Sequence, residues 1–406
     1  MLVPKNCTDP YNKYLPDTEK EFISILSAFD DQIYEIYLVG GAIRDILLGI
    51  SPNEIDIALK GSFNTFLKEL EKNSKVEIIQ VTEFGTAKIN FKGKLIDIAN
   101  TRTEAYIPKG SLPKINQLSV DIENDLHRRD FTINSIAYCI NNSNNNLIDP
   151  NNGLSDIKQR LIRNIHNESF SDDPTRIFRA IKYSLRLDFN IESKTSSELK
   201  SKSNLINNLS KYRILNEVKK SLDEKNPEKI IKKLIQLNIF RYFFDISKVN
   251  INFNKSPKGI TNYEYLILYF TYKDEGKLPN YLNNFDNSKS LAKKVDHLKN
   301  INHVVAYILK NDINDFPSEL YIKIHKIPKQ LFNVFKSFNK DDKIITDLVN
   351  KLTNSKPFLN FNDIKKLGFK DAKEIANLLL KLEISKFNNH LVSIKDEEDF
   401  IKKFIN

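Results

Sequence analysis

Two carboxylates in the segment Glu54-Ile55-Asp56 have the spacing of a divalent-metal site. Apolar residues alternate with other residues from Glu54 to Leu59, as in a strand, so Glu54 and Asp56 share one face. Two carboxylates on one strand face can hold a pair of magnesium ions about 3.5 to 4 Å apart. Such a pair would stabilise the attacking and the leaving oxygens of a phosphoryl displacement, and that is the chemistry predicted here.

The glycine pair that precedes this segment predicts a phosphate-binding turn. Residues 36–39 are typical of a short buried strand, Gly40 and Gly41 allow a tight turn, and residues 42–48 have helical apolar spacing. A triphosphate can lie against the amide groups of such a helix start, with Arg44 one turn in. Each element alone is also compatible with ordinary turn and edge-strand chemistry, but their order and spacing together favour the site.

Asp97 adds a third candidate carboxylate. It lies in the strand expected at residues 94–99, on the face opposite Ile96 and Ile98. We expect it near the metals as a ligand or a base, and the alternative is a solvated aspartate.

A charged cluster from Leu126 to Ala137 runs directly into an apolar segment. Arg129 can bind phosphate oxygens bidentately, while Asp130 and Asn134 suit a ribose hydroxyl or a second phosphate. The alternative is a surface patch of salt bridges.

A helix expected after Asp172-Asp173-Pro174 has two distinct sides. Ile177, Phe178, Ile181 and Leu185 share one of them, and Asp173, Arg176 and Arg179 fall on the other. The polar side therefore faces a ligand, or else Asp173 pairs with Arg176 on the helix surface.

Composition limits the class of protein. A chain of 406 residues indicates two or three domains, and a net charge of +10 fits a polyanionic partner, although an abundance of lysine explains it equally well. The two cysteines form no metal or disulfide pattern, and neither a leader segment nor an apolar run of membrane-spanning length is evident. We expect a cytoplasmic protein without a membrane partner.

The organisation of the chain changes near the asparagine-rich residues 141–146. Short strands alternate with helices before this segment, and the pattern after it is almost wholly helical. The expected fold class is therefore α+β, with an α/β head followed by helices.

These motifs resemble the class II tRNA nucleotidyltransferases, or CCA-adding enzymes, and the related bacterial poly(A) polymerases. The resemblance covers roughly the first 220 residues, in the family's order, through residues 37–49, 84–86, 126–137, 147–150, 153–154, 156–157, 161–163 and 172–180. It implies a polymerase-beta-like nucleotidyltransferase head at 1–146, a helical neck at 147–230, and a helical body and tail at 231–406 that bind tRNA. A weaker likeness to the family's tail helices appears at residues 359–380.

The resemblance also assigns roles to the candidate residues. Asp173 and Arg176 would read the Watson-Crick edge of cytosine or adenine, in place of a template, with Arg179 supporting the same pocket. Two Mg²⁺ ions would bind Glu54 and Asp56, and CTP, ATP and the tRNA 3′ end would be the substrates. The expected catalytic residues are Glu54, Asp56 and Asp97; those expected to bind nucleotide are Gly40, Gly41, Arg44, Arg129, Asp130, Asn134, Asp173, Arg176 and Arg179.

Three features depart from, or qualify, the family pattern. Glu54 stands where the family usually has aspartate, Asp172 stands where it usually has glutamate, and residues 101–114 look closer to the loop of relatives that add only C or only A. Addition of C, of A or of both therefore stays open. The rival functions are a poly(A) polymerase and an RNA-binding protein whose metal site has decayed.

Arg213 and Glu217 lie one turn apart in a further family-like segment, Ser210 to Glu217. We expect an intrahelical ion pair between them that braces the neck.

Overall fold

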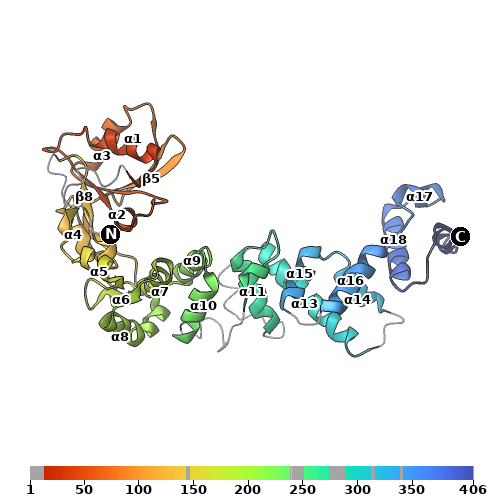
Figure 1. Cartoon of the computed structure of the whole chain (residues 1–406). Helices are drawn as coiled ribbons and strands as arrows, with labels where there is room; N and C mark the ends of the chain where they lie inside the picture. Colours follow the sequence, from red (N-terminus) through yellow and green to blue (C-terminus); the bar gives the residue numbers. More distant parts are fainter. Residues whose placement is uncertain are drawn as a thin grey trace. The chain divides into compact units, whose positions relative to one another are not determined.

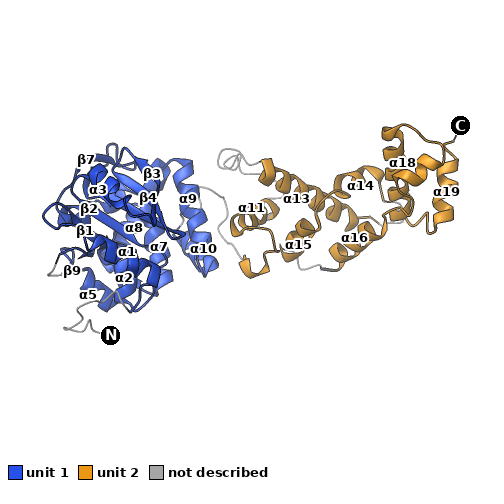
Figure 2. Ribbon diagram, turned by 90° about the horizontal axis from the view of Figure 1, so that it is seen from above, with its two compact units in different colours: residues 1–242 blue, residues 243–406 orange. Residues whose placement is uncertain are grey.

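The computed structural model divides into two units, residues 1–242 and 243–406 (Figure 2). It describes residues 13–142, 147–237, 239, 251–273, 289–311, 316–338 and 342–405. Within these residues every strand belongs to the first unit, and the second unit is helical (Figure 1). The expected α+β class, with an α/β head followed by helices, is confirmed.

A seven-stranded mixed sheet forms the centre of the head, in the order β3-β4-β5-β2-β1-β8-β9. Only the β2–β5 pair is parallel within it. The strands are β1 (Glu35–Val39), β2 (Asp56–Lys60), β3 (Val76–Thr82), β4 (Thr86–Phe91), β5 (Lys94–Asn100), β8 (Ala137–Cys139) and β9 (Leu147–Ile148).

The two faces of this sheet have different partners. Helix α1 (Asp17–Leu26) sets Phe22 against Phe91 of β4, and α3 (Phe63–Leu70) sets Phe66 against Tyr34, next to β1. On the other face, α4 (Ile122–His127) packs on Tyr37 and Ala58. Because Asp56 follows the same alternation as Ala58, its side chain lies on the α4 side of the sheet.

The connections of the head carry several of the candidate residues. Helix α2 (Gly41–Leu47) follows β1, and the 3₁₀ turn η1 (Thr132–Asn134) precedes β8. A separate two-stranded hairpin consists of β6 (Arg102–Ala105) and β7 (Lys114–Leu118), and residues 106–113 form its loop.

The remainder of the first unit is a set of helices in which α7 packs against α9 and α10. A short parallel pair, β10 (Leu161–Ile162) and β11 (Asn190–Ile191), joins them. The elements are α5 (Gly153–Gln159), α6 (Ser169–Asp172), α7 (Thr175–Leu187), α8 (Ser193–Ser201), η2 (Ser203–Asn208), α9 (Lys211–Leu222) and α10 (Pro227–Gln236).

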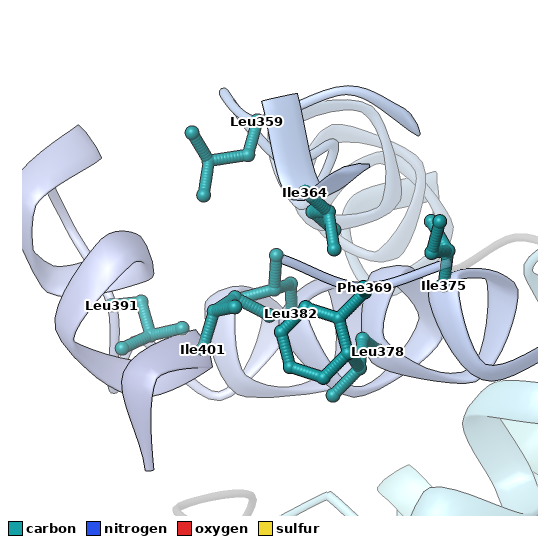
Figure 3. Packing of buried hydrophobic residues seen from close by; sticks show 8 residues of the cluster. All are labelled: Leu359, Ile364, Phe369, Ile375, Leu378, Leu382, Leu391 and Ile401. Atoms are coloured by element: carbon teal, nitrogen blue, oxygen red, sulfur yellow. The ribbon is translucent and has the colours of Figure 1, made fainter. Parts of the chain in front are cut away.

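The second unit ends in a small helical module with its own apolar cluster (Figure 3). Next to this cluster, the fully buried Glu397 carboxylate accepts hydrogen bonds from the amides of Phe358 and Leu359 and pairs with Lys386 at 3.1 Å. The helices among the described residues of the unit are α11 (Asn262–Lys273), α13 (Lys289–Ile308), α14 (Ser318–Ile324), α15 (Lys329–Phe338), α16 (Asp342–Asn354), α17 (Phe361–Lys366), α18 (Ala372–Phe387) and α19 (Ile394–Lys402), and the 3₁₀ turn η4 (Phe253–Lys255) precedes them.

The three expected domains, 1–146, 147–230 and 231–406, stay a prediction. The first boundary falls at residues 143–146, which lie outside the described residues, and the second falls inside α10. In the described part of the chain, no helix combines the length and the apolar character needed to cross a membrane.

We predict that Gly153→Ala destabilises the head. A Cβ atom at this position would lie 2.2 Å from the carbonyl oxygen of Thr132, in the turn that carries Asn134. Relief of this clash requires α5 to move away from η1, at a cost of about 2–3 kcal/mol. Urea unfolding measures the change, and Ser155→Ala on the exposed side of α5 is the control. Equal stability of the two variants would contradict this packing.

Candidate functional site

The strand register brings two of the candidate carboxylates together. Asp56 is directly paired with Asp97 across the parallel strands β2 and β5, and with Val39 on the other side. Glu54 lies two residues before Asp56, in a bend outside β2, so the expectation that both carboxylates belong to one strand face is wrong. Asp97 also forms an ion pair of 3.0 Å with Lys88 of β4. The described structure therefore places Asp56 and Asp97 side by side, while the metal and catalytic roles of the three acids stay predictions.

The position of Gly40 explains why a glycine is needed between β1 and α2. Its φ is +73°, and a Cβ atom there would lie 3.2 Å from Nη1 of Arg129 and 3.3 Å from Oδ2 of Asp56. The bare Cα thus lets the guanidinium of Arg129 and the carboxylate of Asp56 approach the same point of the backbone.

Arg129 is held by the buried Asp125, a residue that the sequence did not single out. Oδ2 of Asp125 accepts hydrogen bonds from Nε and Nη2 of Arg129, and Oδ1 accepts two from Arg128. Burial alone would raise the pKa of Asp125, but the two arginines lower it below its usual range. The carboxylate therefore stays charged and fixes both guanidinium groups. Its spacing of three and four residues before the arginines is the signal that could have revealed it.

Asp130 and Asn134 link the head to helix α7. Oδ1 of Asp130 accepts from the Asn134 amide and Oδ2 accepts from Arg179, at 2.7 Å from Nε and 2.6 Å from Nη2. The Asn134 carbonyl in turn accepts from Nη1 of Arg44 at 2.6 Å. Although burial opposes it, the charge of Arg179 and these hydrogen bonds lower the pKa of Asp130 to about 2. These side chains position one another, and any direct contact with a ligand stays a prediction.

The two candidate base readers are also held in place. Arg176 is buried and donates to the Ser169 hydroxyl at 2.6 Å and to the Arg128 carbonyl at 2.7 Å. Asp173 lies directly before helix α7 and accepts hydrogen bonds from the amide and the hydroxyl of Thr175, at 2.9 and 2.7 Å. Within the described structure no ion pair joins Asp173 to Arg176, so the helix-surface pairing is not formed.

The expected intrahelical pair of Arg213 with Glu217 is wrong. Arg213 instead reaches out of α9 to Asp173, at 2.8 Å, and to the carbonyl oxygens of Gly110 and Ser111. It thereby ties the loop of the β6–β7 hairpin to the start of α7. Three long-range acceptors satisfy this guanidinium better than one neighbouring carboxylate on the same helix can.

All of the predicted site residues line one cleft of about 1080 Å³ in the first unit. The wall also contains Tyr106, from the segment 101–114 already noted in the sequence, and three residues that the sequence analysis missed, Tyr183, Lys182 and Arg186. Tyr183 lies among cations, with the guanidinium carbons of Arg44 and Arg179 at 5.3 and 5.4 Å from its ring centre. The sequence alone does not indicate that this ring lies among cations, because an aromatic residue on the buried face of a helix usually packs in the core.

The acidic corner of this cleft is suited to a cation. Burial raises the pKa of Asp56, and the charges of Asp97 and Glu54 raise it further, while Arg129 opposes them. No group of three His, Cys, Asp or Glu side chains suited to a metal ion is formed by the described residues. Two carboxylates nevertheless fit Mg²⁺, because this ion is commonly bound by one or two carboxylates together with substrate phosphates and water.

Two family descriptions match the chain. Residues 36–163 match "Poly A polymerase head domain", and residues 188–248 match "Probable RNA and SrmB- binding site of polymerase A".

Individual proteins resemble this chain over longer stretches than the two family descriptions do. The A-adding tRNA nucleotidyltransferase of Halalkalibacterium halodurans is 25% identical over 91% of this chain and 89% of its own length. The solved structure of a CCA-adding enzyme with CTP has a TM-score of 0.76 at 25% identity, with 98% of each chain covered. The A-adding tRNA nucleotidyltransferase of Geobacter sulfurreducens is 35% identical over 57% of this chain. The expected family resemblance is confirmed.

The chain spans only part of some relatives. It covers 27% of the length of the Geobacter protein, and 23% of a second A-adding enzyme, from Aquifex aeolicus.

We predict that Asp130→Asn lowers stability by about 2 kcal/mol at pH 7, because the charge that holds Arg179 is lost. The folded pKa of Asp130 is depressed, so its contribution is fully present above the unfolded value near 3.8 and is lost as the pH falls towards 2. Urea unfolding between pH 7 and pH 3 measures the free energy of unfolding of both proteins. The difference between wild type and variant should become smaller below pH 4.

Asp188→Asn provides the matched control. Asp188 pairs with Arg160 on the surface, and this pair should contribute little to the free energy of unfolding. A gap for Asp130→Asn that stays constant down to pH 3 would argue against the charged pair.

Proposed function

We propose that the chain, which resembles the class II tRNA nucleotidyltransferases and bacterial poly(A) polymerases, is a template-independent tRNA nucleotidyltransferase that adds C and A, from CTP and ATP, to the tRNA 3′ end. One observation carries the proposal: the carboxylates of Asp56 and Asp97 line the same cleft as the side chains of Asp173 and Arg176. The groups suited to nucleotidyl transfer and those suited to reading a base therefore lie within reach of one nucleotide.

The acidic corner is the proposed place of reaction. Two Mg²⁺ ions bound by Glu54 and Asp56 would supply charge stabilisation for the attacking 3′ hydroxyl and for the leaving pyrophosphate. Arg129 lies beside Asp56 across Gly40, where its guanidinium can hold a phosphate of the nucleotide while Asp125 keeps it in position. Gly41 and Arg44 belong to the same phosphate side of the cleft.

Base selection is assigned to Asp173 and Arg176. All three hydrogen bonds that Asp173 accepts from Thr175 and Arg213 go to Oδ1, so Oδ2 remains as an acceptor for an exocyclic amine. Cytosine and adenine both carry such an amine, and a guanidinium can donate to a ring nitrogen of either base or to the carbonyl of cytosine. Arg179 would support this pocket from the next turn of α7.

The RNA is proposed to be the top half of tRNA, recognised by its shape and its backbone. The net charge of +10 favours such a polyanion, and the helical second unit, including the module in Figure 3, is the proposed contact surface. A cytoplasmic location belongs to the same proposal.

Addition of A alone is the second candidate. It is favoured by the match to the A-adding enzyme of Halalkalibacterium halodurans, which extends over 389 residues, and by the form of the 101–114 segment.

A direct assay tests the proposal and separates the two candidates. The protein is incubated with tRNA lacking its terminal CCA, and with tRNA ending in CC, in the presence of CTP alone, ATP alone or both. The 3′ ends are then sequenced. Restoration of CCA is the expected outcome, whereas extension only of the CC-ending tRNA, by a single A, identifies an A-adding enzyme. A long run of adenosines, or no extension at all, would refute both.

We predict that Asp56→Ala reduces nucleotide incorporation by about a thousandfold or more, because stabilisation of the transferred phosphoryl group by metal is worth several kcal/mol. Binding of tRNA, measured by filter retention, should change little. Asp188→Asn, at an exposed position of the same unit where the left-handed backbone tolerates asparagine, is the control and should leave both quantities unaltered. Persistent incorporation by Asp56→Ala would remove this carboxylate from the mechanism.

A further inference from the structure

A lysine lies next to the two paired carboxylates of the acidic corner. Lys88 of β4 is directly paired with Asp97 of β5, and Asp97 is directly paired with Asp56 of β2. Directly paired residues of neighbouring strands point to the same face of a sheet. The three side chains therefore form a row across β4, β5 and β2, with one cation beside two anions.

The ammonium group of Lys88 contacts both oxygens of the Asp97 carboxylate. Its Nζ lies 3.0 Å from Oδ1 and 3.4 Å from Oδ2. Both side chains are open to solvent, because that of Lys88 is 42% exposed and that of Asp97 is 57% exposed. An exposed ion pair of this kind contributes little to stability, and the lysine stem is flexible. Lys88 can therefore leave Asp97 at a small cost in free energy.

The cation on the other side of the acidic corner is held much more firmly. Arg129 approaches Asp56 across Gly40, and the buried Asp125 fixes its guanidinium with two hydrogen bonds. Lys88 has no such support, since Asp97 is its one hydrogen-bond acceptor among the described residues. Of the two cations that flank the carboxylates, Lys88 is the one that can give way to another cation.

A divalent cation would need the oxygens that Lys88 now contacts. Neighbouring strands lie about 4.8 Å apart, so an ion bound by Asp56 would meet the carboxylate of Asp97. Mg²⁺ binds carboxylate oxygens at about 2.0–2.1 Å and carries twice the charge of an ammonium group. The same oxygen lone pairs cannot serve both cations fully, and the two therefore compete for Asp97.

We propose that Lys88 is a positioning residue that competes with the divalent cation for Asp97. It holds this carboxylate while no cation is bound, and it gives the carboxylate up when an ion on Asp56 takes Asp97 as a further ligand. The inference rests on the proposed function and deepens it, because Lys88 then sets the concentration of Mg²⁺ at which the acidic corner is filled.

The test measures cation binding directly, in the full chain and without nucleotide or RNA. Mn²⁺ is the probe, since electron paramagnetic resonance reports the free ion, and Mg²⁺ is measured by its displacement of Mn²⁺. Lys88→Met removes the competing charge and should bind both ions about three- to tenfold more tightly than wild type. Lys88→Arg keeps the charge and should bind them no more tightly than wild type.

Asp97→Asn separates competition for this carboxylate from a general effect of charge. If Lys88 acts through Asp97, Lys88→Met should change the Mn²⁺ affinity much less in the Asp97→Asn protein than in wild type. An undiminished change would mean that the lysine charge acts at a distance, and it would overturn the proposal. Lys68→Met, exposed on α3 at the opposite face of the sheet, controls for the loss of one positive charge. Should Lys88→Met fail to fold, Lys88→Gln takes its place.

Asp56→Ala distinguishes failure of this inference from failure of the proposed function. If Asp56→Ala weakens Mn²⁺ binding while Lys88→Met binds like wild type, the competition is overturned and the proposed function stays intact. If Asp56→Ala binds Mn²⁺ like wild type, the cation site on which both proposals depend is overturned.

Discussion

The ion pair between Asp130 and Arg179 is the contact on which the rest of the site depends. Asp130 belongs to the head and Arg179 to helix α7, so this pair holds the helix that carries Asp173 and Arg176 against the sheet that carries Asp56. Asn134 extends the link to Arg44 next to the glycine turn, and Arg176 adds a second connection through the Arg128 carbonyl. Two groups of residues that are far apart in sequence are thereby held in one cleft, as the positioning of a substrate requires.

The cleft holds its charges in place before any ligand arrives. Asp125 fixes Arg128 and Arg129, Asp130 fixes Arg179, and Glu224 takes two donors of Arg186. Guanidinium groups that are already oriented lose little conformational freedom when they meet phosphate oxygens. Lys182 differs from these arginines, because Oε2 of Glu217 lies 3.8 Å from its ammonium group, too far for a hydrogen bond. The acidic corner shows the opposite imbalance, since burial and the charges of Asp97 and Glu54 raise the pKa of Asp56.

Local patterns predicted most of what local forces control. The alternation around Asp56 and Asp97, the glycine turn and the polar side of α7 all follow from one or two turns of backbone geometry, and the predicted site residues do line one cleft. The prediction of an Arg213–Glu217 pair was wrong because it rested on local spacing alone. A spacing of four residues shows that two side chains can meet, but it does not show whether a partner elsewhere in the chain competes for them. Asp173 and the carbonyl oxygens of Gly110 and Ser111 do so here.

The sequence by itself determined the head fold, the acidic and glycine motifs and the family resemblance, because these depend on residue type at fixed short spacing. Only the tertiary structure decided which cation meets which carboxylate. It placed Asp97 beside Asp56 through a parallel strand pairing, and it left Lys182 buried beside Glu217 without a hydrogen bond. Such pairings join residues that are tens of positions apart. Whether such a pair forms depends on burial and on competition among acceptors, and both are set only when the chain folds.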